Sequence, residues 1–151
     1  MSVRVRTPEA MRELGVELAA GLKPGDLVLL IGPVGAGKTT LAQGIGAGLG
    51  VSGVLSPTFV IARVHADGRV PLVHVDAYRL SSIEEVDDLD LDASLEESVT
   101  LVEWGEGLVE GLAGNRLEIR IERDDDDVRR VDVAAIGERW ATSPLSPRRA
   151  L

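Results

Sequence analysis

The sequence feature that most constrains this chain is a complete phosphate-binding pattern, Gly-x-x-x-x-Gly-Lys-[Ser/Thr]. The pattern follows the apolar run Leu27–Ile31 and precedes a segment that can form a helix, which is the strand, loop and helix context that it requires. Backbone N–H groups of such a loop cradle phosphate oxygens, and the helix N-terminus adds positive potential. The sequence therefore predicts that a nucleoside triphosphate binds to Gly32, Pro33, Val34, Gly35, Ala36, Gly37, Lys38, Thr39 and Thr40.

The length and composition favour one catalytic domain. At 151 residues the chain is long enough to bury a core and too short for two ordinary domains. We assign residues 1–140 to a P-loop ATPase domain and expect residues 141–151, with two prolines and paired arginines, to form a disordered tail. Because the chain has no cysteine, disulfides, thiolate metal sites and thiol catalysis are excluded. A bound metal would need oxygen ligands.

Charge and hydropathy bear on partners and location. The net charge of −9 opposes sequence-independent binding to nucleic acid, which depends on Lys and Arg. No apolar run approaches the roughly 20 residues of a membrane span, and Met1–Arg6 lacks the apolar centre of a signal peptide. We therefore expect a cytoplasmic protein. Only two of the 16 basic residues are lysines, Lys23 and Lys38, and arginine does not easily replace the compact charge of the motif lysine.

Hydrophobic periodicity predicts the secondary structure. An amphipathic helix is expected at about residues 8–22, because Thr7-Pro8-Glu9 provides an N-cap, a first-turn proline and an acid. The uninterrupted apolar run at 27–31 is typical of a central parallel strand buried on both faces. The other expected elements are a short strand at 2–6, a helix at 39–49, strands at 59–65, 70–76, 99–103, 116–123 and 128–136, and short helices beginning near 81 and ending near 112.

These elements predict an α/β fold, a single P-loop NTPase domain whose mainly parallel central sheet is flanked by helices and extended by antiparallel hairpins. Hairpin turns are expected at Asp67-Gly68 and at the four aspartates 124–127, which lack the ligand spacing of a calcium loop. Glycines 44, 46 and 48 lie within the second expected helix, and each costs about 1 kcal/mol relative to alanine. They indicate either close packing against the sheet or a frayed helix.

Two of the predicted strands end in carboxylates, Asp76 after Val73-His74-Val75 and Glu103 after Leu101-Val102. The carboxyl ends of parallel strands face the ligand crevice, so both acids could converge on the loop and hold Mg²⁺. The structural alternative is that each acid merely terminates a strand. Two such acids beside a complete phosphate-binding loop favour the functional interpretation.

Other polar residues extend the expected site. Thr39 should supply its hydroxyl to Mg²⁺, with a capping role as the alternative. Thr58 lies about twenty residues beyond the loop, where many P-loop switch proteins place a threonine that senses the γ-phosphate. His65 and His74 are expected to pack within or beside the sheet in preference to binding metal.

Missing motifs narrow the nucleotide and the reaction. Asn115 is the only asparagine, so the Asn-Lys-x-Asp element that reads guanine is absent and ATP is favoured over GTP. The chain has no Leu-Ser-Gly-Gly-Gln stretch of transporter ATPases and no room for the lid domain of a typical small-molecule kinase.

Four blocks of the sequence occur in a characteristic order and spacing. They are Gly-Pro-Val-Gly-Ala-Gly-Lys-Thr-Thr, Ser56-Pro57-Thr58-Phe59, His74-Val75-Asp76-Ala77-Tyr78-Arg79-Leu80 and Leu101-Val102-Glu103-Trp104. Together they resemble the TsaE family, the ATPase component of bacterial tRNA threonylcarbamoyladenosine synthesis. The resemblance covers about residues 8–123, and the Asp-x-Tyr-Arg-Leu and Val-Glu-Trp blocks are more discriminating than the phosphate-binding loop. One departure is Gly105, where a proline is common after the tryptophan.

The resemblance implies a P-loop protein that binds ATP with Mg²⁺ and acts with TsaB and TsaD subunits. The TsaD-type partner transfers a threonylcarbamoyl group to the adenosine next to the anticodon, so contact with tRNA is indirect. By motif match, Lys38 and Thr39 bind phosphate and Mg²⁺, and Thr58 is the switch threonine. Asp76 organises the Mg²⁺ site and Glu103 is the second carboxylate. Trp104 either contacts the nucleotide or packs beside it.

The leading hypothesis is an ATP hydrolase that is slow alone and stimulated in complex. No arginine is obviously placed as a finger, and supplying one typically raises turnover by about 10³–10⁵. Arg79 is a candidate within the chain, with a structural ion pair as the alternative. Two other hypotheses are a nucleotide-dependent assembly switch whose hydrolysis is incidental, and a small-molecule kinase.

Overall fold

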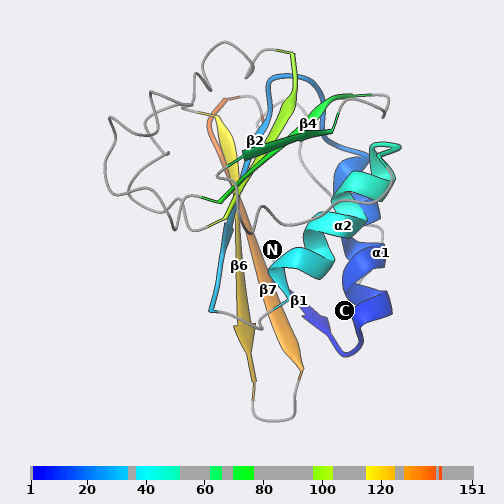
Figure 1. Ribbon diagram of the computed structural model, residues 1–151. Helices are drawn as coiled ribbons and strands as arrows, with labels where there is room; N and C mark the ends of the chain where they lie inside the picture. The colour runs from blue at the N-terminus through cyan, green and yellow to red at the C-terminus, as the bar shows by residue number, and fades with distance from the viewer. Residues whose placement is uncertain are drawn as a thin grey trace.

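The computed structural model describes residues 2–33, 37–51, 62–65, 70–76, 97–103, 115–124, 128–138 and 140. Two helices lie side by side on one face of a twisted sheet (Figure 1). The elements are β1 (Ser2–Val5), α1 (Pro8–Ala19), β2 (Leu27–Ile31), α2 (Lys38–Gly48), β3 (Ala62–His65), β4 (Leu72–Asp76), β5 (Val99–Glu103), β6 (Arg116–Arg123) and β7 (Arg129–Ile136).

The sheet has seven strands in the order β1-β7-β6-β2-β5-β4-β3. Its four central strands, β6, β2, β5 and β4, run parallel to one another. The outer pairs β1–β7, β6–β7 and β3–β4 are antiparallel. This arrangement confirms the predicted α/β fold with a parallel centre and antiparallel additions, and it places the short N-terminal strand at an edge of the sheet.

Helix α1 begins where its sequence predicts. Thr7 has an extended backbone and its hydroxyl accepts a hydrogen bond from the backbone N–H of Ala10 at 3.0 Å, with Pro8 following in the first turn. The helix ends at Ala19, three residues before the predicted end, because two tight turns follow it. In these turns the backbone N–H groups of Gly21 and Leu22 donate to carbonyls three residues earlier. Leu22 is still buried, which explains why its spacing looked helical.

Glycines form the contact between the two helices. A Cβ on Gly44 would lie 2.2 Å from the backbone oxygen of Arg12, and one on Gly48 would lie 2.5 Å from the Cβ of Ala19. Gly15 of α1 is equally close, since its Cβ would lie 2.6 Å from the oxygen of Leu41. Of the two interpretations of these glycines, close packing is therefore correct for Gly44 and Gly48. For these two glycines the expected partner was wrong, because they approach α1 and not the sheet. The interpretation of Gly46 stays a prediction.

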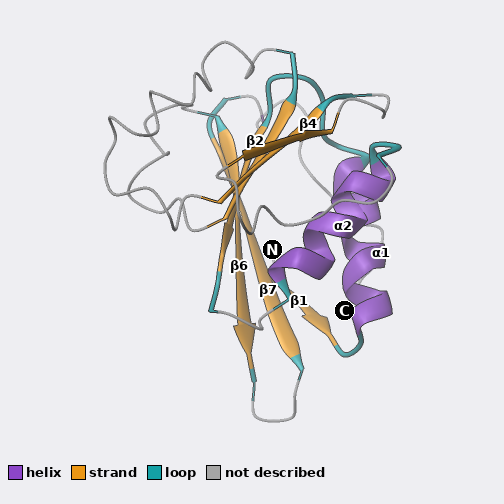
Figure 2. Ribbon diagram, in the orientation of Figure 1, coloured by secondary structure: helices purple, strands orange, loops and turns teal. Residues whose placement is uncertain are grey.

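Figure 2 shows both helices on one side of the sheet. The core contains buried residues of the two helices and of the strands that they cover. Along β2, Val28 and Leu30 belong to the cluster that includes helix residues such as Leu18 and Ile45. Leu29, on the opposite face of the same strand, is also fully buried. The prediction that residues 27–31 form a strand buried on both faces is confirmed.

Several predicted features lie outside the described residues. These are the helices near 81 and 112, the first part of the strand predicted at 59–65 and the tail at 141–151. Neither described helix is long and apolar enough to cross a membrane.

Candidate functional site

The phosphate-binding pattern joins the end of β2 to the start of α2, as its strand, loop and helix context predicts. Gly32 and Pro33 follow β2, and Gly37 is the N-cap of α2, while Val34, Gly35 and Ala36 lie outside the described residues. Gly37 has φ 113° and no side chain to cap the helix. A left-handed conformation strongly favours glycine, and an added Cβ would also lie 3.1 Å from Cε of Met11. The backbone conformation therefore favours a glycine here, and the space beside Met11 is tight.

Lys38 is the first residue of α2, and its side chain is buried against the loop. Its residue exposure is 6%, and its ammonium donates a hydrogen bond to the backbone carbonyl of Gly32. A buried ammonium needs such partners because an unpaired charge is costly to remove from water. The positive charge of Lys38 thus lies beside Gly32, the first residue of the loop that the motif assigns to phosphate.

The two threonines that follow Lys38 lie on the first turn of α2. Thr39 is exposed and Thr40 is partly exposed. The first turn of a helix leaves backbone N–H groups without intrahelical partners. With a glycine N-cap that offers no side-chain oxygen, the start of α2 is suited to an anionic group.

The two predicted carboxylates are neighbours in the sheet. Asp76 is paired with Glu103 in the parallel β4–β5 register, and Glu103 is paired with Leu30 in the β2–β5 register. Leu30 lies two residues before Gly32, where the loop begins. The expectation that both acids lie at the loop edge of the sheet therefore agrees with the strand register. Only the backbone of Asp76 is described.

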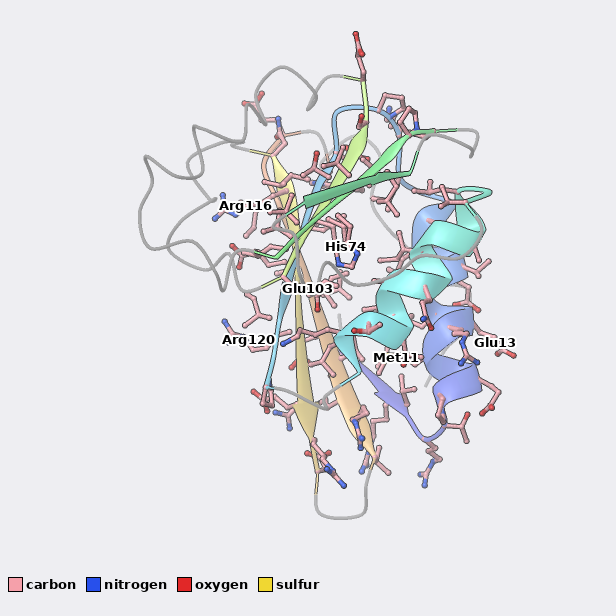
Figure 3. All side chains as sticks on the ribbon, viewed as in Figure 1. Met11, Glu13, His74, Glu103, Arg116 and Arg120 are labelled. Atoms are coloured by element: carbon pink, nitrogen blue, oxygen red, sulfur yellow. The ribbon has the colours of Figure 1, made fainter. Side chains whose placement is uncertain are left out.

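Glu103 is almost completely buried and has a specific partner. Its residue exposure is 6%, and its Oε2 accepts a hydrogen bond from Nε2 of the fully buried His74 at 2.7 Å. Both side chains lie between the strands and α2 (Figure 3). This is the face of the sheet that carries Leu30 and Leu101, because residues paired across parallel strands point to the same side.

The His74–Glu103 contact is a feature that sequence reasoning missed. His74 was expected only to pack within or beside the sheet, and its complete burial agrees with that expectation. The contact follows from register, since His74 precedes Asp76 by two residues and Asp76 is paired with Glu103. The available signal in the sequence was a histidine, His74, that occurs within an apolar strand two residues before the acid that ends it.

The remaining predicted site residues stay untested. Thr58, Arg79 and Trp104 lie outside the described residues, and only the backbone of His65 is described, in β3. The described part of the site thus consists of both ends of the loop, the first turn of α2 and the ends of β4 and β5.

Comparison with known proteins identifies the family. The family model described as "Threonylcarbamoyl adenosine biosynthesis protein TsaE" matches residues 5–131. A relative from Streptomyces coelicolor, named tRNA threonylcarbamoyladenosine biosynthesis protein TsaE, is 61% identical over 145 residues, covering 90% of this chain and 97% of the relative. A relative of the same name from Mycobacterium leprae is 46% identical over 144 residues, covering 89% and 87%.

A solved structure shows the same fold. The crystal structure of Bacillus subtilis YdiB superposes with a TM-score of 0.79 at 34% sequence identity, covering 94% of this chain and 89% of YdiB. The family match, the two relatives and this structural likeness each extend over most of the chain, and the match includes every residue of the predicted site. The chain therefore belongs to the TsaE family of threonylcarbamoyl adenosine biosynthesis proteins.

Proposed function

We propose that this protein is a Mg²⁺-dependent ATPase that supports the formation of threonylcarbamoyladenosine in tRNA. The observation that carries the proposal is the strand register at the loop edge of the sheet. It brings Asp76 beside Glu103, and Glu103 beside Leu30, directly before the loop that leads to Lys38 at the start of α2. A phosphate cradle next to two strand-ending acids is the arrangement that nucleotide hydrolysis with a metal ion needs.

The phosphates of ATP would bind at the start of α2. Lys38 would exchange its contact with the Gly32 carbonyl for the β- and γ-phosphates, or share it with them. The exposed Thr39 and the first turn of α2, whose N-cap Gly37 makes no side-chain hydrogen bond, place a hydroxyl and backbone N–H groups at the same end of the helix. These groups bind and orient the triphosphate.

The oxygen donors suit Mg²⁺. We assign Thr39, Asp76 and Glu103 to its site, directly or through water, because Mg²⁺ prefers hard oxygen ligands and keeps several waters. When bound, the ion neutralises charge that develops on the phosphate oxygens. Thr58 is assigned to sensing the γ-phosphate and Trp104 to the edge of the nucleotide site, both by motif match.

The biological role is proposed from the family. Relatives of this chain bear the name tRNA threonylcarbamoyladenosine biosynthesis protein. We propose that the protein works with TsaB- and TsaD-type subunits and that its hydrolysis supports repeated turnover of that assembly. With a net charge of −9, contact with tRNA is assigned to the partners.

The test is ATP hydrolysis by the purified protein with and without the two partner subunits. The proposal predicts slow, Mg²⁺-dependent phosphate release alone and a clear increase in the complex. Equal rates would contradict stimulation, and no hydrolysis in either state would contradict the ATPase assignment. Phosphate transferred to an acceptor in place of water would identify a kinase. Full support of repeated tRNA modification by a variant that binds ATP without hydrolysing it would identify an assembly switch.

A further inference from the structure

We propose that His74 is a positioning residue that orients the carboxylate of Glu103 for its role in the nucleotide site. The inference rests on the proposed function, in which Glu103 is one of the site carboxylates. It assigns a role to a buried histidine that would otherwise count as part of the core.

The burial of His74 is the first observation. Its exposure is 0%, and its pairing partner in β5 is the core residue Leu101. Valine or leucine occupies the positions around it, such as Leu72 on the same face of β4. Burying a polar ring is unfavourable unless it forms hydrogen bonds, so an apolar side chain would suit simple packing better.

The hydrogen bond to Glu103 is the second observation. The 2.7 Å distance between Nε2 of His74 and Oε2 of Glu103 is short, as in charge-assisted hydrogen bonds. Glu103 is paired with Asp76 and not with His74, so the contact runs diagonally between the two strands. Both residues lie on adjacent central strands, and a rigid pair of strands fixes the geometry of the contact.

The chemistry of the contact sets the direction of donation. An ionised carboxylate only accepts hydrogen bonds, so Nε2 of His74 carries the hydrogen. The other ring nitrogen, Nδ1 of His74, has no hydrogen-bond partner among the described residues. Within this part of the chain, Glu103 is therefore the polar group that orients the imidazole, and the imidazole orients Glu103.

The contact leaves the carboxylate able to serve the site. It engages one oxygen of Glu103, whereas an ionised carboxylate offers about four lone-pair positions. The side chain of Glu103 retains 8% exposure. Glu103 thus lies between the core and the loop edge, held from the core side by His74.

A positioning role predicts a specific pattern of effects. Replacement of residues that orient metal-site ligands typically lowers activity or metal affinity about 10–100-fold. His74→Leu should therefore lower kcat for ATP by about that factor, more than it changes KM. His74→Gln, whose side-chain nitrogen can reach the position of Nε2, should recover most of the loss. Because His74 acts through Glu103, combining His74→Leu with Glu103→Gln should lower kcat no further than Glu103→Gln alone.

A second measurement does not depend on turnover. The affinity for a non-hydrolysable ATP analogue is measured with Mg²⁺ and with EDTA for wild type, His74→Leu and His74→Gln. Affinities in EDTA should agree, because the Lys38 contact is intact, whereas the gain in affinity from Mg²⁺ should shrink only in His74→Leu. Thermal unfolding checks that each variant is folded. If His74→Leu does not fold, His74→Asn, whose shorter amide does not reach the Nε2 position, takes its place.

The outcomes separate the two proposals. A wild-type protein that hydrolyses no ATP contradicts the proposed function, while the analogue measurement still decides on His74. Three results would overturn the positioning role. The first is an equal gain in analogue affinity from Mg²⁺ in all variants, and the second is an equal loss of kcat in His74→Gln and His74→Leu. The third is additive loss of kcat in the double variant.

Discussion

The ammonium of Lys38 donates a hydrogen bond to the backbone carbonyl of Gly32, so the last part of the phosphate-binding pattern is tied to its first residue. The contact keeps the charge of a buried lysine paired when no phosphate is bound. It also places that charge where the triphosphate is proposed to bind.

Lys38→Ala should lower the affinity for ATP by about 100-fold, since hydrogen bonds to charged groups contribute roughly 1.5–3 kcal/mol. Equilibrium titration with a fluorescent ATP analogue measures the loss. The matched control is Lys23→Ala, which removes the only other lysine, an exposed residue in the turn before β2. The lysine assignment would be wrong if both variants bound the analogue as wild type does.

Replacing either strand-ending acid should affect turnover more than binding of the free nucleotide. Asp76→Ala and Glu103→Ala should each lower Mg²⁺-dependent hydrolysis at least about 100-fold, because several kcal/mol of charge stabilisation are lost at the metal site. Steady-state phosphate release measures the effect. The control is Glu122→Gln, which removes an acid of β6 that pairs with Arg130 of β7. Wild-type turnover in both acid variants would remove them from the site.

Gly37→Ala should weaken nucleotide binding and destabilise the protein. A left-handed conformation costs a residue with a Cβ roughly 1–2 kcal/mol, and the new methyl group would press against Met11. Chemical denaturation and analogue titration measure the two effects. Adding Met11→Ala relieves the side-chain contact and leaves the backbone strain. If the binding defect disappeared in the double variant, the left-handed backbone conformation of Gly37 would not be its cause.

Gly44→Ala tests the helix contact by the sign of its effect. Helix propensity alone predicts that alanine stabilises α2 by about 1 kcal/mol. The structure predicts a loss of about 1–3 kcal/mol, because the methyl group would overlap the backbone of Arg12. The exposed residue Ala47 supplies the control, since Ala47→Gly should show the propensity effect without a contact. A stabilising Gly44→Ala would mean that the helices are farther apart.

Local patterns in the sequence were sufficient to predict most described elements. The strands at 99–103 and 116–123 were predicted with the observed bounds, and the helix at 8–22 began at the observed residue. Helix caps, apolar runs and the alternation of polar and apolar residues each extend over only a few residues, so they can be recognised in a single sequence. The predicted convergence of Asp76 and Glu103 also needed only the rule that parallel strands end at one edge.

Relationships between distant segments were not predictable in the same way. The contact between His74 and Glu103 depends on a register that only the assembled sheet defines. The predicted packing partner of Gly44 was wrong for the same reason. A glycine in a helix indicates that another element packs closely, but it does not identify that element. Site roles for Thr58 and Trp104 stay predictions.

The most direct test of the central claim is reconstitution with TsaB- and TsaD-type subunits and tRNA, following phosphate release and modified adenosine in one reaction. The account predicts that wild type supports multiple rounds of modification with accompanying ATP hydrolysis, and that Lys38→Ala supports neither. Sustained modification at the wild-type rate with Lys38→Ala would contradict it.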